Sequence, residues 1–458
     1  MKIVQPSTPH IHSEPARERL AEERIVILGG AALRGEVEVS GSKNSSLAIL
    51  AASLLASRGE CVLHNVPDIS DVATMCDMLR SLGAHVEQHG HTVVVNAETL
   101  NTHVAPDHLV RKMRASFYVA APLLARLRQA EVPLPGGCVL GARPVNYHVE
   151  AFQKMGAEIK VEHGAMLAHA PNWRGAAIYL EPKNSSVGAT VNIMMAACLA
   201  TGTTTIENAA REPEVSDLAS LLNKMGGKVS GAGTSTISIE GVSELTGAEH
   251  TVDHDRIEAG TYLAAAGLTH GDITTRGLSP QHLPIYLDKL REAGLDVTHG
   301  DDWIRAHYVR PLQATDIVTA PFPGYATDLQ PPFVTMMCVA QGRSAVRENL
   351  YDGRFNCVPE LMRMGASISL IDNTAIVNGV SNLSGAEVQA SDLRAGASLV
   401  LAGLGAEGPT EVTNVHWIDR GYEKFEDKLR GLGAQIVRRD RHDNRVLDLV
   451  DMPKSATA

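Results

Sequence analysis

The sequence is poor in aromatic residues, in paired cysteines and in long apolar runs. Aromatic side chains make up only 4% of the 458 residues, so a hydrophobic core must be built mainly from Leu, Val, Ile, Met and Ala. The six cysteines are scattered without a C-x-x-C pair, which argues against a structural zinc site and against a disulfide-rich secreted scaffold. The longest apolar runs, such as residues 47–56, are too short to span a bilayer.

The chain also has fewer positive than negative side chains. The chain has 41 Lys and Arg against 52 Asp and Glu, a formal net charge of -11, which makes it a poor candidate for non-specific nucleic-acid binding. Residues 1–24 contain no apolar signal core, and we expect them and residues 441–458 to be flexible extensions. We expect a cytoplasmic protein without nucleic-acid partners or membrane insertion; an anionic substrate would have to meet a local cluster of cations.

A repeat runs through the chain between these ends. A Leu or Phe, two residues, an apolar residue and a glycine recur six times, and successive glycines are 68 to 73 residues apart. The six glycines are Gly83, Gly156, Gly226, Gly294, Gly365 and Gly433. Each fits the left-handed end of an amphipathic helix.

Each repeat also predicts two strands and a second, more apolar helix. Strands are expected after the glycine, as in residues 84–88 and 92–95, or 366–370 and 375–377. The apolar helices, which favour burial on all sides, are expected at residues 46–56, 190–200, 259–266 and 395–404. Six α/β units grouped three and three predict two domains of similar size.

The stretch 134–146 combines three glycines, two prolines, Cys138 and Arg143. Glycine permits close approach of the backbone to a ligand, and the arginine suits an anion, so a loop that carries a reactive thiol is one interpretation. A surface turn with an incidental cysteine is the other, and the residues of this stretch do not separate the two.

Three further stretches place polar groups before apolar helices. Residues 41–44 and 183–190 suit either phosphate binding at a helix N-terminus or ordinary helix capping. Residues 111–116 carry three cations, which fit an anion site or a solvated basic face.

Carboxylates and arginines gather in loops of the second half. Asp328 follows a predicted strand and is either a helix N-cap or a general base. Arg354, Arg394 and Arg420 each have an aspartate one or two positions earlier, so each is either in a local ion pair or part of a shared cation cluster. Loops at matching positions of repeats should converge in space, which favours the cluster.

These motifs resemble the enolpyruvyl transferase family from about residue 25 to residue 438. The resemblance rests mainly on residues 41–44, 135–144, 207–214, 327–330, 391–394 and 418–422. It implies the inside-out α/β barrel, with two domains of three βαβαββ-type repeats each. The implied domains are residues 44–252, which carry the Cys138 loop, and residues 25–43 joined to 253–440.

The resemblance also implies an activity. The enolpyruvyl group of phosphoenolpyruvate would move to the 3-hydroxyl of UDP-N-acetylglucosamine with release of phosphate, the first committed step of peptidoglycan synthesis, without a cofactor or metal. Lys43, Arg143 and Arg420 would bind phosphoenolpyruvate, helped by Arg354 and Arg394. Asp328 would deprotonate the attacking hydroxyl. Cys138 would donate a proton to the methylene carbon and would be the target of fosfomycin. The implied catalytic residues are Cys138, Asp328, Lys43 and Arg420, and the implied nucleotide-sugar contacts are Asn44, Arg114, Arg143, Pro144, Val145, Asn146, Tyr147, Lys183, Ser186, Val187, Gly188 and Leu350.

Four departures from the family pattern leave the acceptor open. They are Asn146 in place of Asp, Asp352-Gly353 in place of Glu-Asn, one extra residue near Lys183, and Pro331-Pro332 after the Asp328 motif. The same chemistry on another nucleotide or sugar is a second hypothesis, and a non-catalytic nucleotide-sugar-binding paralogue is a third. The sequence does not predict the oligomeric state.

Overall fold

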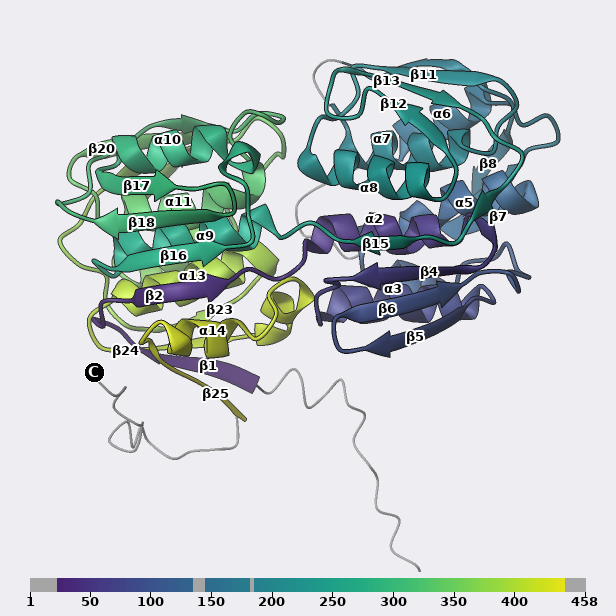
Figure 1. Cartoon of the computed structure of the whole chain (residues 1–458). Helices are drawn as coiled ribbons and strands as arrows, with labels where there is room; N and C mark the ends of the chain where they lie inside the picture. The colour runs from purple at the N-terminus through teal and green to yellow at the C-terminus, as the bar shows by residue number, and fades with distance from the viewer. Residues whose placement is uncertain (1–22, 135–144, 182–184, 441–458) are drawn as a thin grey trace, which may run out of the picture.

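The computed structural model describes residues 23–134, 145–181 and 185–440, which form two domains side by side (Figure 1). Buried apolar residues form two separate clusters. One runs from Leu47 to Val252, and the other joins Ile25–Val39 to Ile257–Ile436. The predicted grouping of six units into three and three is confirmed by the sheets described below. The predicted boundaries after residues 43 and 252 stay a prediction.

Three sheets cover the domain that contains residues 47–252. Their strand orders are β15(Glu249–Thr251)-β4(Glu60–His64)-β6(Thr92–Asn96)-β5(His85–His89), β7(Gln129–Pro133)-β9(Ala165–His169)-β8(Glu158–Glu162) and β10(Ala177–Tyr179)-β11(Thr203–Glu207)-β13(Thr236–Glu240)-β12(Lys228–Ser230). A two-stranded pair, β14(Leu245–Thr246) with β3(Ala56–Arg58), adds to them.

Three four-stranded sheets cover the other domain in the same way. Their orders are β17(Leu295–His299)-β18(Trp303–Tyr308)-β16(Asp272–Arg276)-β2(Arg34–Glu38), β19(Ile317–Val318)-β20(Arg343–Arg347)-β22(Thr374–Asn378)-β21(Ser367–Ile371) and β23(Glu387–Gln389)-β24(Pro409–Thr413)-β1(Glu23–Leu28)-β25(Gln435–Asp440). The first described strand, β1, lies antiparallel between β24 and β25, and this pairing places the first of the described residues beside the last. It begins at Glu23, two residues before the predicted start, because Glu23 and Arg24 extend the pairing with β25.

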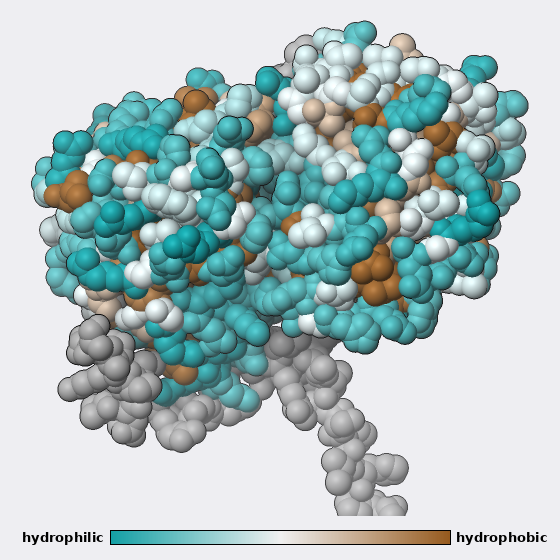
Figure 2. Space-filling model, viewed as in Figure 1, coloured by the Kyte–Doolittle hydropathy of each residue, from teal (hydrophilic) through white to brown (hydrophobic). Residues whose placement is uncertain are grey.

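Apolar helices fill the inside of each domain, and the sheets lie outside them (Figure 1). The inner helices are α2(Lys43–Ser53), α5(Ala120–Leu127), α7(Val187–Ala197), α9(Arg256–Leu268), α11(Gln330–Met337) and α13(Leu393–Gly405). All residues of α9 are buried, as expected for a helix that is apolar on every side. The face in Figure 2 is mainly hydrophilic with scattered apolar patches.

The inner helices begin earlier than their apolar pattern predicts. The helix predicted from residue 46 begins at Lys43, and the one predicted from residue 190 begins at Val187. In both cases a serine side chain, Ser42 or Ser186, accepts a hydrogen bond from a first-turn backbone N–H at 3.2 Å. The first turn of α2 is therefore helical although its residues are polar, and that of α7 is helical although it contains Gly188; both turns line the site described below.

The six repeat glycines follow the more amphipathic helices, as predicted. These are α3(Ser70–Ser81), α6(Asn146–Lys154), α8(Pro213–Lys224), α10(Pro284–Glu292), α12(Val358–Arg363) and α14(Phe425–Gly431). All six glycines have φ between 91° and 105°, the conformation that favours glycine. The strand pairs predicted after residues 83 and 365 are β5 with β6 and β21 with β22.

The two domains are joined by two chain segments that lie against each other. The backbone N–H of Ser42 donates to Asp253 O at 2.7 Å, and that of Asp255 donates to Ser40 O at 2.8 Å. A Cβ at Gly41 would lie 1.7 Å from the Asn65 carbonyl oxygen, so this close approach requires glycine. The crossing therefore brings the beginnings of α2 and α9 together at the domain boundary.

Candidate active site

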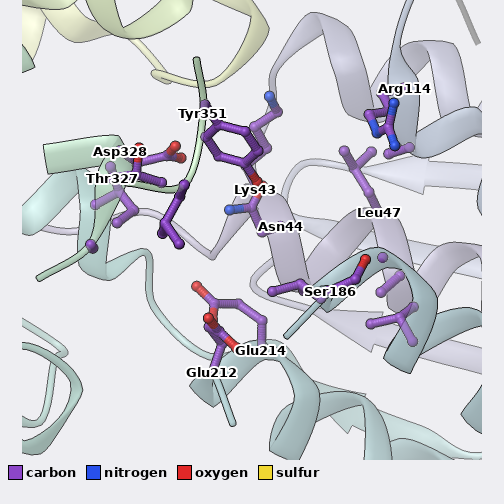
Figure 3. Close-up of a pocket in the computed structure, with 18 of the residues that line it drawn as sticks. Lys43, Asn44, Leu47, Arg114, Ser186, Glu212, Glu214, Thr327, Asp328 and Tyr351 are labelled. Atoms are coloured by element: carbon purple, nitrogen blue, oxygen red, sulfur yellow. The ribbon is translucent and has the colours of Figure 1, made fainter. Parts of the chain in front are cut away.

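A cavity of about 500 Å³ lies between the two domains, and residues from both line it (Figure 3). All six inner helices begin at this cavity, α5 and α11 through the preceding 3-10 turns η1(Arg114–Val119) and η4(Thr327–Leu329). Helix N-termini carry partial positive charge and unpaired N–H groups. The inner helices of both domains thus direct electropositive N-terminal ends toward one place.

The first charged cluster joins the two domains. Asp71, in the first turn of α3, is 4% exposed and accepts contacts from two cations. Lys43 Nζ lies 3.0 Å from Asp71 Oδ2, and Arg420 Nε lies 2.9 Å from Asp71 Oδ1. Burial by itself raises the pKa of Asp71, but Lys43 and Arg420 outweigh it, so that this pKa lies below its ordinary value.

The second charged cluster surrounds Asp328. Arg354 Nη2 lies 2.6 Å from Asp328 Oδ1, and Arg394 Nη2 lies 3.0 Å from Asp328 Oδ2. Burial opposes the ionisation of Asp328, but the two arginines prevail and hold its pKa well below the ordinary range. Arg354 also donates to Thr327 Oγ1 at 3.0 Å, and Figure 3 shows Thr327 and Asp328 on the same side of the cavity as Tyr351.

A third ion pair, which also lines the cavity, joins the two domains. Arg256 Nε and Nη2, at the start of α9, donate to Glu214 Oε1 and Oε2 at 2.9 and 3.3 Å. Glu212 lies beside them on the cavity wall, and burial raises its pKa although Arg256 opposes the shift. The cavity therefore contains carboxylates as well as cations. Four of its arginines are held by carboxylates before any ligand enters: Arg256, Arg354, Arg394 and Arg420.

The opposite wall is more apolar and is built around a buried histidine. The Asn192 side-chain amide donates to Phe117 O at 3.3 Å and to His148 Nδ1 at 2.8 Å, so His148 carries its proton on Nε2. Burial and the charge of Arg114 lower the pKa of His148 to about 3. This histidine is neutral at physiological pH and packs below Gly188, the second residue of α7.

The cavity gathers every described residue of the predicted site. These are Lys43, Asn44, Arg114, Val145, Asn146, Tyr147, Ser186, Val187, Gly188, Asp328, Leu350, Arg354, Arg394 and Arg420. Cys138, Arg143, Pro144 and Lys183 lie outside the described residues. The convergence of distant loops that the repeats favoured is therefore found for all residues that the structure describes.

The structure overturns the local ion pairs considered for three arginines. The guanidinium groups of Arg354 and Arg394 both contact Asp328, and that of Arg420 contacts Asp71. None of the three side chains forms an ion pair with its nearby aspartate, although the backbone N–H of Arg394 donates to Asp392 Oδ1 at 3.0 Å. The neighbouring aspartates have other partners: Asp392 caps α13, Asp419 contacts Arg438, and Asp352 accepts from Asn373. Sequence adjacency misled because closeness in the chain does not fix the direction of a side chain, and carboxylates from distant segments lie closer to these guanidinium groups.

The geometry also settles the roles of three polar stretches at helix starts. Asp328 is not an N-cap: Leu329 precedes α11, and no side-chain capping bond forms there. Ser186 does cap α7 and also lines the cavity, so capping and ligand binding are compatible at this residue. Among the three cations of residues 111–116, Arg111 pairs with Asp107 on the surface, whereas Arg114 lines the cavity.

Sequence reasoning missed Asp71, Glu212, Glu214 and Arg256. Glu212 and Glu214 stand in the stretch 207–214 that contributed to the family resemblance, and this was an available signal. No sequence signal points to Asp71 or Arg256, because a single charged residue near a helix start usually caps the helix or faces solvent. Of the described residues, no three His, Cys, Asp or Glu side chains are arranged to hold a metal ion.

Two sheet-covered domains around one cation-rich cavity define the class of enolpyruvyl-transferring enzymes with an inside-out α/β barrel. The family model of EPSP synthase (3-phosphoshikimate 1-carboxyvinyltransferase) matches residues 27–429. The chain belongs to this family.

Two curated relatives are about half identical to this chain. A UDP-N-acetylglucosamine 1-carboxyvinyltransferase of Trichlorobacter lovleyi is 50% identical over 91% of this chain and 99% of its own length. UDP-N-acetylglucosamine 1-carboxyvinyltransferase 2 of Symbiobacterium thermophilum is 48% identical over 91% of this chain and 98% of its own length. The match therefore spans nearly the whole of these relatives.

Solved structures share the fold. The enolpyruvyl transferase NikO from Streptomyces tendae has a TM-score of 0.82 at 26% identity, covering 91% of this chain and 99% of that one. EPSP synthase from Acinetobacter baumannii has a TM-score of 0.71 at 18% identity over 91% and 100% of the two chains. No helix in the described residues is long and apolar enough for a bilayer span.

Proposed function

We propose that this protein transfers the enolpyruvyl group of phosphoenolpyruvate to the 3-hydroxyl of UDP-N-acetylglucosamine and releases phosphate, the first committed step toward peptidoglycan. The observation that carries the proposal is the single cavity that the described residues of the predicted site line from both domains. Relatives at 48% and 50% identity, which bear the name of this activity, support the choice of acceptor. A cytoplasmic location remains part of the proposal.

The two cation clusters suit the two charged ends of phosphoenolpyruvate. Lys43 and Arg420 would bind the phosphate, and Arg354 and Arg394 would bind the carboxylate. Guanidinium groups pair with phosphate and carboxylate oxygens through two parallel N–H donors. Cations fixed at both ends would orient the substrate and stabilise the charge that moves onto phosphate as it leaves.

The substrate would also activate Asp328 as a base. In the described structure Arg354 and Arg394 hold the pKa of Asp328 far below its ordinary value, so the carboxylate is ionised but weakly basic. A substrate carboxylate that binds the same two guanidinium groups would partly neutralise their charge. The pKa of Asp328 would then rise. Asp328 would then accept the proton of the 3-hydroxyl as its oxygen attacks C2 of phosphoenolpyruvate.

Cys138 would supply the other proton. Addition of the hydroxyl oxygen to C2 requires a proton at C3, and an ordinary thiol is mostly protonated at pH 7. Loss of a proton from C3 and of phosphate from C2 would then restore the enol double bond in the product. Arg143 and Lys183, which like Cys138 and Pro144 lie outside the described residues, complete the proposed phosphoenolpyruvate and nucleotide-sugar contacts.

Phosphate release tests the proposal. Purified protein should release phosphate only when both phosphoenolpyruvate and UDP-N-acetylglucosamine are present, with one phosphate per enolpyruvyl product. Absence of phosphate release with this pair, from folded protein, refutes the proposal.

A different acceptor is the second candidate, and one departure from the family pattern supports it directly. Asn146 lines the cavity, beside the predicted nucleotide contact Tyr147. Asp352, Gly353, Pro331 and Pro332 are not among the residues that line it. A panel of nucleotide sugars, screened by mass spectrometry for an added enolpyruvyl group, separates the two candidates. A non-catalytic paralogue would show no product with any acceptor, and the intact set of cations argues against it.

A further inference from the structure

Asp71 contacts two proposed catalytic residues from different domains, although the mechanism above assigns it no part. Its carboxylate binds Arg420 through two parallel contacts, Nε to Oδ1 at 2.9 Å and Nη2 to Oδ2 at 3.2 Å. The same carboxylate lies 3.0 Å from Lys43 Nζ. Lys43 is the first residue of α2, which packs in the core cluster of Leu47–Val252 although the predicted boundary falls after Lys43. Arg420 is the last residue of η5(Val415–Arg420), which packs in the other cluster.

The contacts of Asp71 use only part of each cation. Asp71 takes two of the five N–H donors of the Arg420 guanidinium and one of the three donors of Lys43. Within the described residues neither cation makes a second ion pair. The Trp417 ring lies 5.3 Å from the Arg420 guanidinium carbon and helps to fix its plane. Because both cations line the cavity, their remaining donors are available to an anion there.

The charge of the cluster also favours an anion. One carboxylate against two cations leaves a net positive charge, in a place where Asp71 is 4% exposed and the side chain of Lys43 is 13% exposed. Such a cluster attracts a phosphate more strongly than a neutral ion pair does, while the carboxylate limits repulsion between the cations before the substrate arrives.

The elements that carry these groups are held from both sides. Glu423, just beyond η5, accepts a hydrogen bond from the Asp68 backbone N–H at 3.2 Å, and its other oxygen lies 2.7 Å from His91 Nε2. Within η5, the Asp419 side chain contacts Arg438 of β25 at 2.6 Å. Asp71 therefore joins two anchored elements rather than two mobile side chains.

We propose that Asp71 is a positioning residue for phosphoenolpyruvate: it holds Lys43 and Arg420 across the domain boundary so that their remaining N–H groups meet the phosphate together. This inference rests on the proposed function. It separates phosphate binding, which depends on Asp71, from nucleotide-sugar binding on the wall around Arg114 and Gly188.

The test is steady-state phosphate release by Asp71→Asn, with each substrate varied in turn. Asparagine keeps the size of the side chain but removes the charge that both cations share. We expect kcat/KM for phosphoenolpyruvate to fall about 10- to 100-fold, the range for charge-assisted hydrogen bonds. The KM for UDP-N-acetylglucosamine should change less than about threefold, since that wall is untouched.

Asp77→Asn is the matched control. Asp77 lies on the same helix, α3, where it forms an exposed pair with Arg80 at 2.9 Å. Its removal changes the net charge by the same amount and should leave both KM values at those of the wild type. A second check combines Asp71→Asn with Arg420→Lys: the double variant should lose less than the product of the two single losses, because both act through one contact.

The outcomes separate the explanations. A lower KM for phosphoenolpyruvate in Asp71→Asn would mean that Asp71 competes with the substrate, and an equal loss for both substrates would mean a general structural role; either overturns the inference. If Asp71→Asn does not fold, Asp71→Glu keeps the charge but shifts it by one methylene, and an unchanged KM for phosphoenolpyruvate in that variant overturns the inference. Inactive wild-type protein refutes the proposed function, whereas normal kinetics in Asp71→Asn beside an active wild type refutes this inference alone.

Discussion

Asp328→Asn is the substitution that probes the site most sharply, because it removes one charge from between two buried cations. Arg354 and Arg394 are 4% and 2% exposed, and Asp328 is the carboxylate that contacts both. Asparagine has nearly the same size and can accept a hydrogen bond from one arginine, so the change tests charge rather than packing. Two opposite effects should follow, one on the empty protein and one on the response to substrate.

The empty protein should lose stability. Removing one member of a buried ion pair costs about 3–5 kcal/mol, because the other charge is left unpaired. The Asp328 side chain is 26% exposed, which gives the arginines access to water in the cavity and reduces the cost. We expect about 2–3 kcal/mol, which corresponds to a fall in melting temperature of about 4–10 °C for a domain of this size.

Phosphoenolpyruvate should stabilise the variant more than the wild type. Without Asp328, the substrate carboxylate meets two unpaired guanidinium groups and has no carboxylate to displace, so ground-state binding should tighten. Turnover should nevertheless fall by at least about 1,000-fold, because the variant lacks the proposed base and binds the ground state rather than the transition state more tightly.

Thermal unfolding with and without phosphoenolpyruvate, together with the phosphate-release assay, measures both effects. Asp352→Asn is the control: Asp352 is exposed, accepts a hydrogen bond from Asn373 and does not line the cavity, and its loss should change neither quantity. Wild-type turnover in Asp328→Asn would remove Asp328 from the mechanism. An unchanged melting temperature, or a smaller response to phosphoenolpyruvate than that of the wild type, would refute the electrostatic argument.

Three further predictions concern the thiol, the buried histidine and the repeat glycines. Cys138→Ser should escape covalent modification by fosfomycin in a mass-spectrometric assay, whereas wild-type protein should be modified faster with nucleotide sugar present; full modification of the variant would identify another nucleophile. Burial and Arg114 lower the pKa of His148 from 6.5 to about 3, so between these two values the unfolded chain binds a proton and the folded protein does not. Stability should therefore fall with decreasing pH by about 1.4 kcal/mol per unit more than in His148→Phe, measured by denaturant titration, and equal slopes would contradict the shift. Gly226→Ala should destabilise the protein by about 1 kcal/mol because φ is 99° with no neighbouring atom within 4 Å, while Gly431→Ala, at a helical position with equal space, should stabilise it slightly; equal effects in thermal unfolding would contradict the backbone explanation.

Much of the fold could be read from the chain because its signals are local and repeated. A glycine such as Gly83 marks a left-handed helix end, and the β-branched run of residues 92–95 is typical of a strand. The starts of α2 and α7 could not be read from hydrophobicity alone, because the first turn of α2 is polar and that of α7 contains Gly188. The serine caps Ser42 and Ser186 set where both helices begin. The apolar pattern reports the part of a helix that is buried, whereas the first turn lies at the cavity.

Site residues were predictable where motifs contain them and unpredictable where only distance in space joins them. The family motifs pointed to Lys43, Asp328 and Arg420, which line one cavity. Asp71 is 349 positions away from its partner Arg420, and the residues next to Asp71 in the chain do not predict the contact. Contacts of this kind exist only after both domains have folded and met.

By itself, then, the sequence determined the six repeated units, their grouping into two domains and the set of charged loops that carry the chemistry, because helix ends, strands and motifs depend on residues close together in the chain. Only the tertiary structure decided which carboxylate faces which cation. That choice depends on the direction of each side chain and on the approach of segments far apart in the chain. As a result, the three arginine side chains pair with distant aspartates and not with the aspartates near them in sequence.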